Sequence, residues 1–331
     1  MGRVNRLLRP MTLLDILDGA FDIYKTNLAT LIGIVAVIYA PVQALATVAR
    51  IFVGSHNPLA STLIDLAYIP VLTVASFLVM GPSMWAISEA YLGHKISVVA
   101  AYRRMLPRVF SFGITYLLWL VALLIPYLFG ALIIGAGIGF GIALIDKSPV
   151  MVLAIIAAVF LGLSAMLIGV GFYVSLIFTC PSFVAEDRRY FSALRRSWQL
   201  IKGYYWRTLG IVLLAFFLII VILQGVCIAA LLAATGLLKD MLLHPQTASL
   251  GTPYILYQIG AMITSIAIEP VWLITIILVY YDLRIRKEGF DLQALAAEMG
   301  YRDPEPAQAA PAYAEAAPGP ATASQDPQQR E

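Results

Sequence analysis

The sequence predicts an all-α, polytopic integral membrane protein with six transmembrane helices. Of its 331 residues 61% are apolar and 12% charged, whereas soluble domains have roughly 45–50% and about 25%. The apolar residues form runs longer than the ~20 residues that cross a hydrocarbon core, and few of these runs hold a central charge. In lipid, such runs satisfy their backbone polar groups as helices, and they lack the alternation of barrel strands.

Four parts are expected along the chain. Residues 1–27 form a cytoplasmic N-terminal amphipathic helix, 28–281 the six-helix transmembrane domain, 282–302 a cytoplasmic juxtamembrane segment, and 303–331 a disordered Pro/Ala-rich tail. The spans are predicted at about 28–53, 62–92, 112–144, 150–179, 208–235 and 254–281. The tail is expected to be disordered because it holds almost no large aliphatic residue that could build a core.

Basic residues predict the orientation of these spans. The N-terminal segment, the second and fourth loops and the segment after the last span are rich in Lys and Arg. The first loop has neither residue type, the third has Lys147 alone and the fifth has Lys239 alone. The positive-inside rule therefore places both termini and the basic loops in the cytoplasm.

A weak internal repeat divides the chain into three units, each an amphipathic helix followed by a transmembrane hairpin. In the first helix, Thr12 and Asp15 have the spacing of a capping box. Prolines recur within the spans or at their ends, where we expect kinks. These are Pro41, Pro82, Pro126, Pro181 and Pro270.

The third connecting helix carries the candidate lipid-contact residues Arg195, Arg196, Trp198 and Lys202. Its apolar residues Phe191, Leu194, Trp198 and Ile201 recur at helical spacing, and the cations lie at the edge where anionic headgroups would be. The alternative is that these cations are ordinary positive-inside residues packed on the helix bundle.

No motif for catalysis, a cofactor or a metal is recognised, so we expect a protein that is not an enzyme and has no cofactor. His56, His94 and His244 are isolated in loops, and Cys180 and Cys227 are far apart in sequence. The run from Gly135 to Gly141 contains two overlapping GxxxG pairs inside an apolar span, which indicates close helix packing rather than phosphate binding.

Glu269 is the candidate intramembrane polar site, because a carboxylate halfway along a span is costly unless it is paired or neutral. Pro270 lacks an N–H and would free a backbone carbonyl one turn earlier, so the pair could form a polar notch. Gln224 and Gln43 are the predicted partners. The alternative is a protonated glutamate that ties two helices together.

Three segments carry a resemblance to a known family. They are Leu8-Arg-Pro-Met-Thr-Leu-Leu-Asp-Ile-Leu-Asp-Gly-Ala-Phe-Asp-Ile-Tyr24, Phe191-Ser-Ala-Leu-Arg-Arg-Ser-Trp-Gln-Leu-Ile-Lys-Gly203 and Tyr280-Tyr-Asp-Leu-Arg-Ile-Arg-Lys-Glu-Gly-Phe-Asp-Leu292. Over residues 8–295 the chain resembles bacterial glycerophosphoryl diester phosphodiesterase membrane domains, without the phosphodiesterase barrel. The resemblance implies a multi-pass protein of the bacterial inner (cytoplasmic) membrane and brings no catalytic residues.

The leading hypothesis is a non-catalytic membrane module that engages anionic membrane lipids, or a protein partner at the cytoplasmic face, through its basic helices. Nucleic acid is not an expected partner. The alternative is a transporter or lipid translocator that uses Glu269 and the proline-containing helices. A hydrolase acting on glycerophosphodiesters is a third hypothesis, and only the name of the resembling family suggests it.

Overall fold

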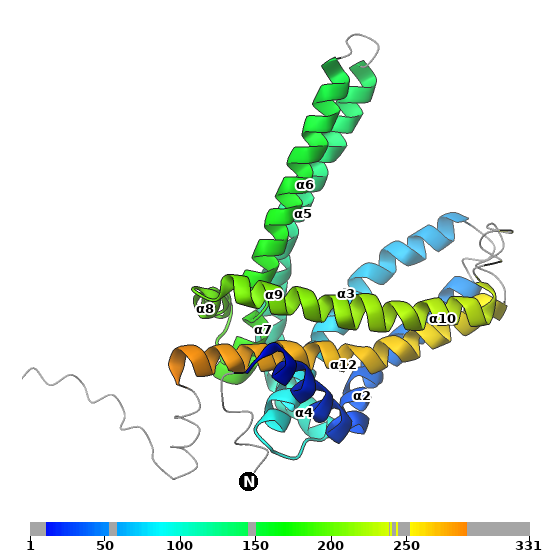
Figure 1. The fold of residues 1–331 in the computed structure, drawn as a ribbon. Helices are drawn as coiled ribbons and strands as arrows, with labels where there is room; N and C mark the ends of the chain where they lie inside the picture. The colour runs from blue at the N-terminus through cyan, green and yellow to red at the C-terminus, as the bar shows by residue number, and fades with distance from the viewer. Residues whose placement is uncertain are drawn as a thin grey trace, which may run out of the picture. The chain divides into compact units, whose positions relative to one another are not determined.

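A computed structural model of the chain is helical throughout its regular structure (Figure 1). The structure describes residues 11–52, 58–144, 150–237, 239, 243 and 252–289. The juxtamembrane segment beyond Gly289 and the predicted disordered tail lie outside the described residues. The elements are α2 (Leu13–Phe52), α3 (Pro58–Tyr91), α4 (Val98–Met105), η2 (Leu106–Arg108), α5 (Val109–Leu144), α6 (Val150–Leu176), α7 (Thr179–Glu186), α8 (Phe191–Ile201), α9 (Tyr205–Phe216), the π-helix η4 (Phe217–Gln224), α10 (Gly225–Thr235) and α12 (Thr252–Glu288).

Six helical segments are long and apolar enough to cross a membrane, which confirms the predicted fold class. The protein is therefore a multi-pass membrane protein. Among the six, the last segment is the central one: 61% of its most apolar stretch is buried, against 6–22% in the other five. It lies in α12, which packs against α2, α3, α9, η4 and α10.

The first predicted boundary coincides with a break inside α2. Asn27 has non-helical dihedral angles (φ −122°, ψ 21°), so α2 consists of a short helix followed by the first span. The Asn27 amide donates to the Ile23 carbonyl oxygen at 3.1 Å. The predicted capping box is also present: the Thr12 N–H donates to Asp15 Oδ2 at 2.9 Å, and the Asp15 N–H donates to Thr12 Oγ1 at 3.3 Å.

Each of the three connecting helices is fixed to a span by a side-chain hydroxyl. Tyr24 of the short helix in α2 donates to the Ala267 carbonyl in α12 at 2.7 Å, and Tyr102 of α4 donates to the Ile34 carbonyl in α2 at 2.7 Å. Ser197 of α8 donates to the Ser175 carbonyl in α6 at 2.8 Å. The three predicted repeat units thus share a hydrogen bond from the connecting helix to a span, which the internal sequence repeat did not predict.

Figure 1 shows α5 and α6 as an antiparallel pair, side by side along their length. The two backbones approach closely at Gly130 and Gly162, where a Cβ added to either glycine would lie 2.7 Å from the carbonyl oxygen of the other. Of the two predicted GxxxG pairs, Gly137 and Gly141 face α6, whereas Gly135 and Gly139 have nothing within 4 Å of an added Cβ. The prediction of close packing is therefore correct for one pair.

Spans four and five are not single continuous α-helices. α6 ends at Leu176, and after a turn at Ile177 and Phe178 the chain forms the short, largely buried helix α7, which contains Pro181. Span five continues from α9 through η4 into α10. The four other predicted prolines lie inside helices that continue through them: Pro41 in α2, Pro82 in α3, Pro126 in α5 and Pro270 in α12.

Candidate functional site

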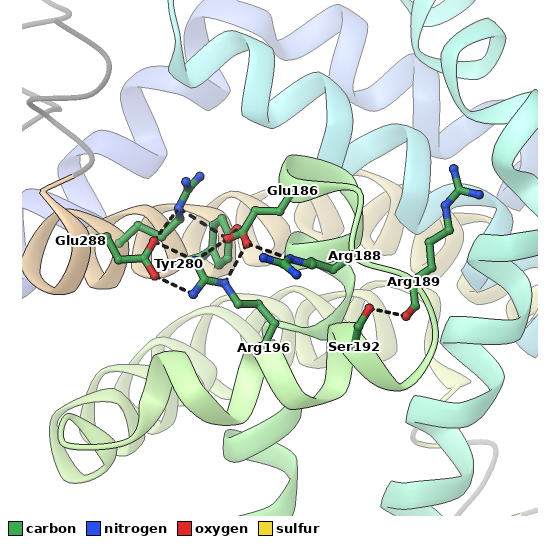
Figure 2. Close-up of polar contacts among 8 residues, drawn as sticks. Glu186, Arg188, Arg189, Ser192, Arg196, Tyr280 and Glu288 are labelled. Carbon is green, nitrogen blue, oxygen red and sulfur yellow. Dashed lines mark hydrogen bonds and ion pairs between the residues drawn. The ribbon is translucent and has the colours of Figure 1, made fainter. Parts of the chain in front are cut away.

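A group of ion pairs joins α7, α8 and the end of α12 (Figure 2). Arg196 of α8 lies between two carboxylates: its Nε donates to Glu186 Oε2 at 2.7 Å, and its Nη2 donates to Glu288 Oε2 at 2.7 Å. The Tyr280 hydroxyl donates to Glu186 Oε1 at 2.6 Å. Arg284 completes the group, with its Nε 3.5 Å from Glu186 and 3.4 Å from Glu288.

These contacts keep Arg196 charged and directed into the protein. The hydrogen bond to Glu288 raises the pKa of the Arg196 guanidinium above its ordinary value, Glu186 adds to the increase, and burial opposes it. The side chain of Arg196 is 18% exposed. Because its donors are already directed at protein carboxylates, Arg196 has little capacity left for a lipid headgroup.

A second cluster holds the start of the described chain against α12. The side chain of Asp282 is fully buried, and its Oδ1 accepts the Met11 N–H at 2.7 Å. Arg207 donates from Nη1 to Asp282 Oδ2 at 2.5 Å, and Arg286 approaches both carboxylate oxygens at 3.0 Å. Both arginines also donate to the Met11 carbonyl, at 2.9 and 2.8 Å. The Met11 N–H and two guanidinium groups thus supply the hydrogen bonds and the positive charge that the buried Asp282 carboxylate needs.

α3 joins the same end of α12 through aromatic side chains. The Tyr91 and Tyr281 rings stack with centroids 4.5 Å apart and an interplanar angle of 8°. The Ser88 and Tyr281 hydroxyls are hydrogen-bonded to each other.

These contacts together bring the three segments that carry the family resemblance to the end of α12. The ends of α3 and α7 and the start of α9 lie at the same place.

The four candidate lipid-contact residues do not share one environment. Arg195 and Trp198 are exposed on α8 and Lys202 is exposed directly after its end, whereas Arg196 lies in the ion pairs described above. In the described part of the chain, neither Arg195 nor Lys202 forms an ion pair. α8 packs inward through Ala193, Ser197, Leu200 and Ile201. Of the predicted apolar stripe, Phe191 is 71% and Trp198 51% exposed.

The predicted neighbours of Glu269 are not bonded to it. Gln224 Nε2 donates to Ser265 Oγ at 3.5 Å, and Ser265 lies one turn before Glu269 on α12. The Gln43 side chain forms no hydrogen bond with a described residue, and its backbone carbonyl accepts from the Thr47 hydroxyl. Among the described residues, none forms a hydrogen bond or an ion pair with the Glu269 carboxylate. Pro270 is buried. The backbone carbonyl of Ala267, three residues before Pro270, accepts a hydrogen bond from the Tyr24 hydroxyl.

The sequence did not single out Asp282, Glu186 or Arg207 as site residues. The i, i+4 spacing of Asp282 with Arg286 and of Arg284 with Glu288 could have indicated ion pairs along one helix, which the structure contains. Glu186 and Arg207 reach the cluster from other helices, and nothing in their local sequence indicates that pairing.

Comparison with known proteins gives a family but no activity. Residues 11–282 match the model of a domain of unknown function, DUF7847. No curated protein matches the chain, and neither does any solved structure. The match does not name the phosphodiesterase membrane domain that the sequence resembles. Because it covers most of the chain, from Met11 to Asp282, the protein belongs to the DUF7847 family.

Proposed function

We propose that this protein is a non-catalytic module of the bacterial inner membrane that binds anionic lipid at its cytoplasmic face, through the exposed side of α8. The proposal rests on the different environments of the cations in and directly after this helix. Arg196 is bound by Glu186 and Glu288, whereas Arg195 and Lys202 are exposed and, within the described residues, have no carboxylate partner.

The exposed side of α8 has the chemistry of a membrane interface. Trp198 exposes an amphipathic ring of the kind enriched at headgroup level, and Phe191 adds apolar surface. A cation near an anionic membrane surface contributes about 1 kcal/mol to attraction. Arg103 and Arg104 on α4 are exposed in the same way, beside Leu106 at 71% exposure.

One further observation supports the cytoplasmic orientation. Contacts gather the start of α2, helix α8 and the end of α12 into one region, and these are the segments that the positive-inside rule assigns to one side. Lys287, for example, donates to the Gln199 carbonyl at the end of α8. The resemblance to phosphodiesterase membrane domains supports the bacterial inner membrane.

Lipid retention tests the proposal. The full-length protein would be extracted into nanodiscs containing phosphatidylglycerol and phosphatidylethanolamine and analysed by native mass spectrometry. Arg195→Gln combined with Lys202→Gln is expected to lose about 2 kcal/mol of attraction, or roughly thirtyfold in retained phosphatidylglycerol. The matched control is Lys147→Gln with Lys239→Gln, which removes the same charge from the two loops predicted to lie on the other side of the membrane.

The control variant is expected to retain phosphatidylglycerol like the wild type. Unchanged retention in the Arg195/Lys202 variant would contradict the proposal. Loss of a co-purifying subunit in that variant, with lipid retention unchanged, would favour a protein partner at this face instead.

A transporter is the second candidate, because Glu269 lies within a membrane span without a bonded partner in the described structure. Transport would require that the site bind a ligand. Glu269→Gln should then reduce flux of that ligand in reconstituted vesicles, and unchanged flux would exclude a role for Glu269.

A further inference from the structure

Arg50 is a cation in a part of the chain where the positive-inside rule predicts none. Residues 26–94, which hold the first two spans and the loop between them, contain no other Lys or Arg. From the break at Asn27 to Arg50, α2 is about 35 Å long, which slightly exceeds the ~30 Å thickness of a hydrocarbon core. Arg50 therefore lies at the level of lipid headgroups, at the opposite end of the first span from the region that contains α8.

Two side chains of α3 hold the Arg50 guanidinium in place. Its Nε donates to Asp65 Oδ1 at 2.8 Å, and its Cζ lies 5.1 Å from the centroid of the Tyr68 ring. The side chain of Arg50 is only 21% exposed, and Tyr68 is partly buried. One edge and one face of the guanidinium are thus occupied by protein, which limits the conformations that this long side chain can adopt.

The ion pair of Arg50 and Asp65 keeps polar atoms that the protein does not use. Within the described ranges, neither Nη1 nor Nη2 of Arg50 forms a hydrogen bond, and Oδ2 of Asp65 accepts none. The Asp65 side chain is 61% exposed. An ion pair with such an exposed member contributes little to stability, so stabilisation alone does not account for two charges at this position.

The surroundings of this ion pair are apolar. Exposed aliphatic and aromatic side chains lie within about two helical turns of it on both helices. They are Leu45, Val48 and Phe52 on α2, and Leu63, Leu66 and Ile69 on α3. Such faces contact acyl chains, and charged side chains beside them reach toward the headgroups. The unused atoms of Arg50 and Asp65 are therefore accessible to the polar part of a lipid.

The charges of the pair indicate which headgroup fits. A guanidinium binds phosphate through parallel N–H donors, and the two NH2 groups of Arg50 supply such donors. The carboxylate of Asp65 beside them repels a further anionic group and attracts an ammonium group. Because the net charge of the pair is zero, a headgroup that carries both a phosphate and an ammonium matches it better than an anionic headgroup.

We propose that Arg50 and Asp65 form a binding site for a zwitterionic group in which a phosphate and an ammonium are neighbours. The phosphate binds the Nη groups of Arg50, the ammonium binds Oδ2 of Asp65, and Tyr68 is a positioning residue for the guanidinium. The ligand can be the headgroup of phosphatidylethanolamine or a soluble phosphoethanolamine. This site is separate from the proposed anionic-lipid surface, since α8 contributes none of its residues.

The test compares three preparations of the full-length protein in nanodiscs. The first contains equal amounts of phosphatidylethanolamine and phosphatidylglycerol, the second phosphatidylglycerol alone, and the third phosphatidylglycerol with soluble phosphoethanolamine added. Native mass spectrometry counts both retained lipids in the first preparation. Thermal unfolding in the second and third detects stabilisation by the soluble zwitterion.

Two variants are expected to change lipid selectivity in different ways. Arg50→Gln should lower retention of phosphatidylethanolamine at least about tenfold, because it removes charge-assisted hydrogen bonds to the phosphate. It should leave retention of phosphatidylglycerol unchanged. Asp65→Asn should lower retention of phosphatidylethanolamine and raise that of phosphatidylglycerol, since the site then carries a net positive charge. The control, Lys239→Gln, removes an exposed cation from a loop predicted to lie on the same side of the membrane, and should change neither.

Tyr68 separates positioning of the guanidinium from a general effect on folding. Tyr68→Phe keeps the ring face and should retain phosphatidylethanolamine like the wild type, whereas Tyr68→Leu removes the ring and should lower retention. Both lipids are counted on the same folded molecules. A change in their ratio therefore reports on the site and not on the amount of folded protein.

The two sources of the zwitterion give distinct supporting results. Selective retention of phosphatidylethanolamine that Arg50→Gln abolishes identifies a lipid headgroup as the ligand. Stabilisation by phosphoethanolamine in phosphatidylglycerol alone, abolished by the same variant, identifies a soluble ligand. The absence of both effects in the wild-type protein would overturn the proposal. So would an Arg50→Gln variant that loses phosphatidylglycerol and keeps phosphatidylethanolamine.

Discussion

The Met11 N–H donates a hydrogen bond to Asp282 Oδ1 at 2.7 Å, and so joins two residues that are 271 positions apart in the sequence. These residues are also the first and last of the family match. The bond belongs to a cluster in which Arg207 and Arg286 contact both the Asp282 carboxylate and the Met11 carbonyl. The start of the domain is therefore fixed to its last helix.

Asp282→Asn is expected to destabilise the protein strongly. The substitution removes the charge that balances Arg207 and Arg286, and breaking a buried ion pair from one side costs about 3–5 kcal/mol. Thermal unfolding can be followed with a thiol-reactive dye, because Cys180 is buried and becomes reactive on unfolding. Asp22→Asn, which alters an exposed carboxylate, should leave Tm unchanged. Equal Tm values for Asp282→Asn and the wild type would refute a stabilising role for the Asp282 carboxylate.

Neighbouring arginines on α8 are expected to differ in their effect on stability. Arg196→Gln should lower the free energy of unfolding by about 1.5–3 kcal/mol, because it removes hydrogen bonds between charged groups. Arg195→Gln should be close to neutral, since Arg195 is exposed. The measurement is thermal unfolding of the two variants in the same detergent. Equal losses of stability would contradict the conclusion that Arg196, and not Arg195, stabilises the protein.

The stabilisation by Arg196 should not depend on pH between 6 and 10. Its pKa is raised in the folded protein, chiefly by the hydrogen bond to Glu288, so the stabilisation is complete at any pH below the ordinary arginine pKa. It would be lost only as the pH rises through the still higher folded value. The difference in Tm between wild type and Arg196→Gln should therefore stay constant across this range, and a decline toward pH 10 would contradict it.

The packing of α5 on α6 predicts opposite results for two glycines of one helix. Gly130→Ala places a methyl group 2.7 Å from the Gly162 carbonyl oxygen, and we expect a loss of about 1–3 kcal/mol as the helices separate. Gly139→Ala meets nothing within 4 Å and should be neutral or slightly stabilising, because alanine favours helix. Equal Tm changes in the two variants would exclude close packing at Gly130.

Much of the fold could be predicted because hydropathy and helix capping are local properties of the sequence. The six spans follow from apolar runs, the break at Asn27 lies at the predicted boundary, and the capping box of Thr12 and Asp15 is present. The break before α7 lies close to Pro181, where a kink was expected, whereas η4 was not predicted, because a continuous apolar run carries no signal for a π-helix within it.

Less of the candidate site could be predicted, because the residues that form its ion pairs are far apart in the sequence. Arg196 was predicted to contact lipid with Arg195, since adjacent cations look alike in sequence, but only the fold brings Glu186 and Glu288 to one of them. Glu269 was recognised from its depth in a span, but the predicted hydrogen bonds to Gln224 and Gln43 are not formed, because their distances depend on how the helices pack.

Photo-crosslinking from α8 tests the central claim most directly. A benzophenone amino acid would replace the exposed Trp198 in one variant and the buried Leu200 in another, and both would be irradiated in native membranes. The proposed function predicts that position 198 crosslinks to anionic lipid, that this product decreases when Arg195 and Lys202 are neutralised, and that position 200 crosslinks only within the protein. Crosslinks from position 198 to another protein, with no lipid product, would contradict it.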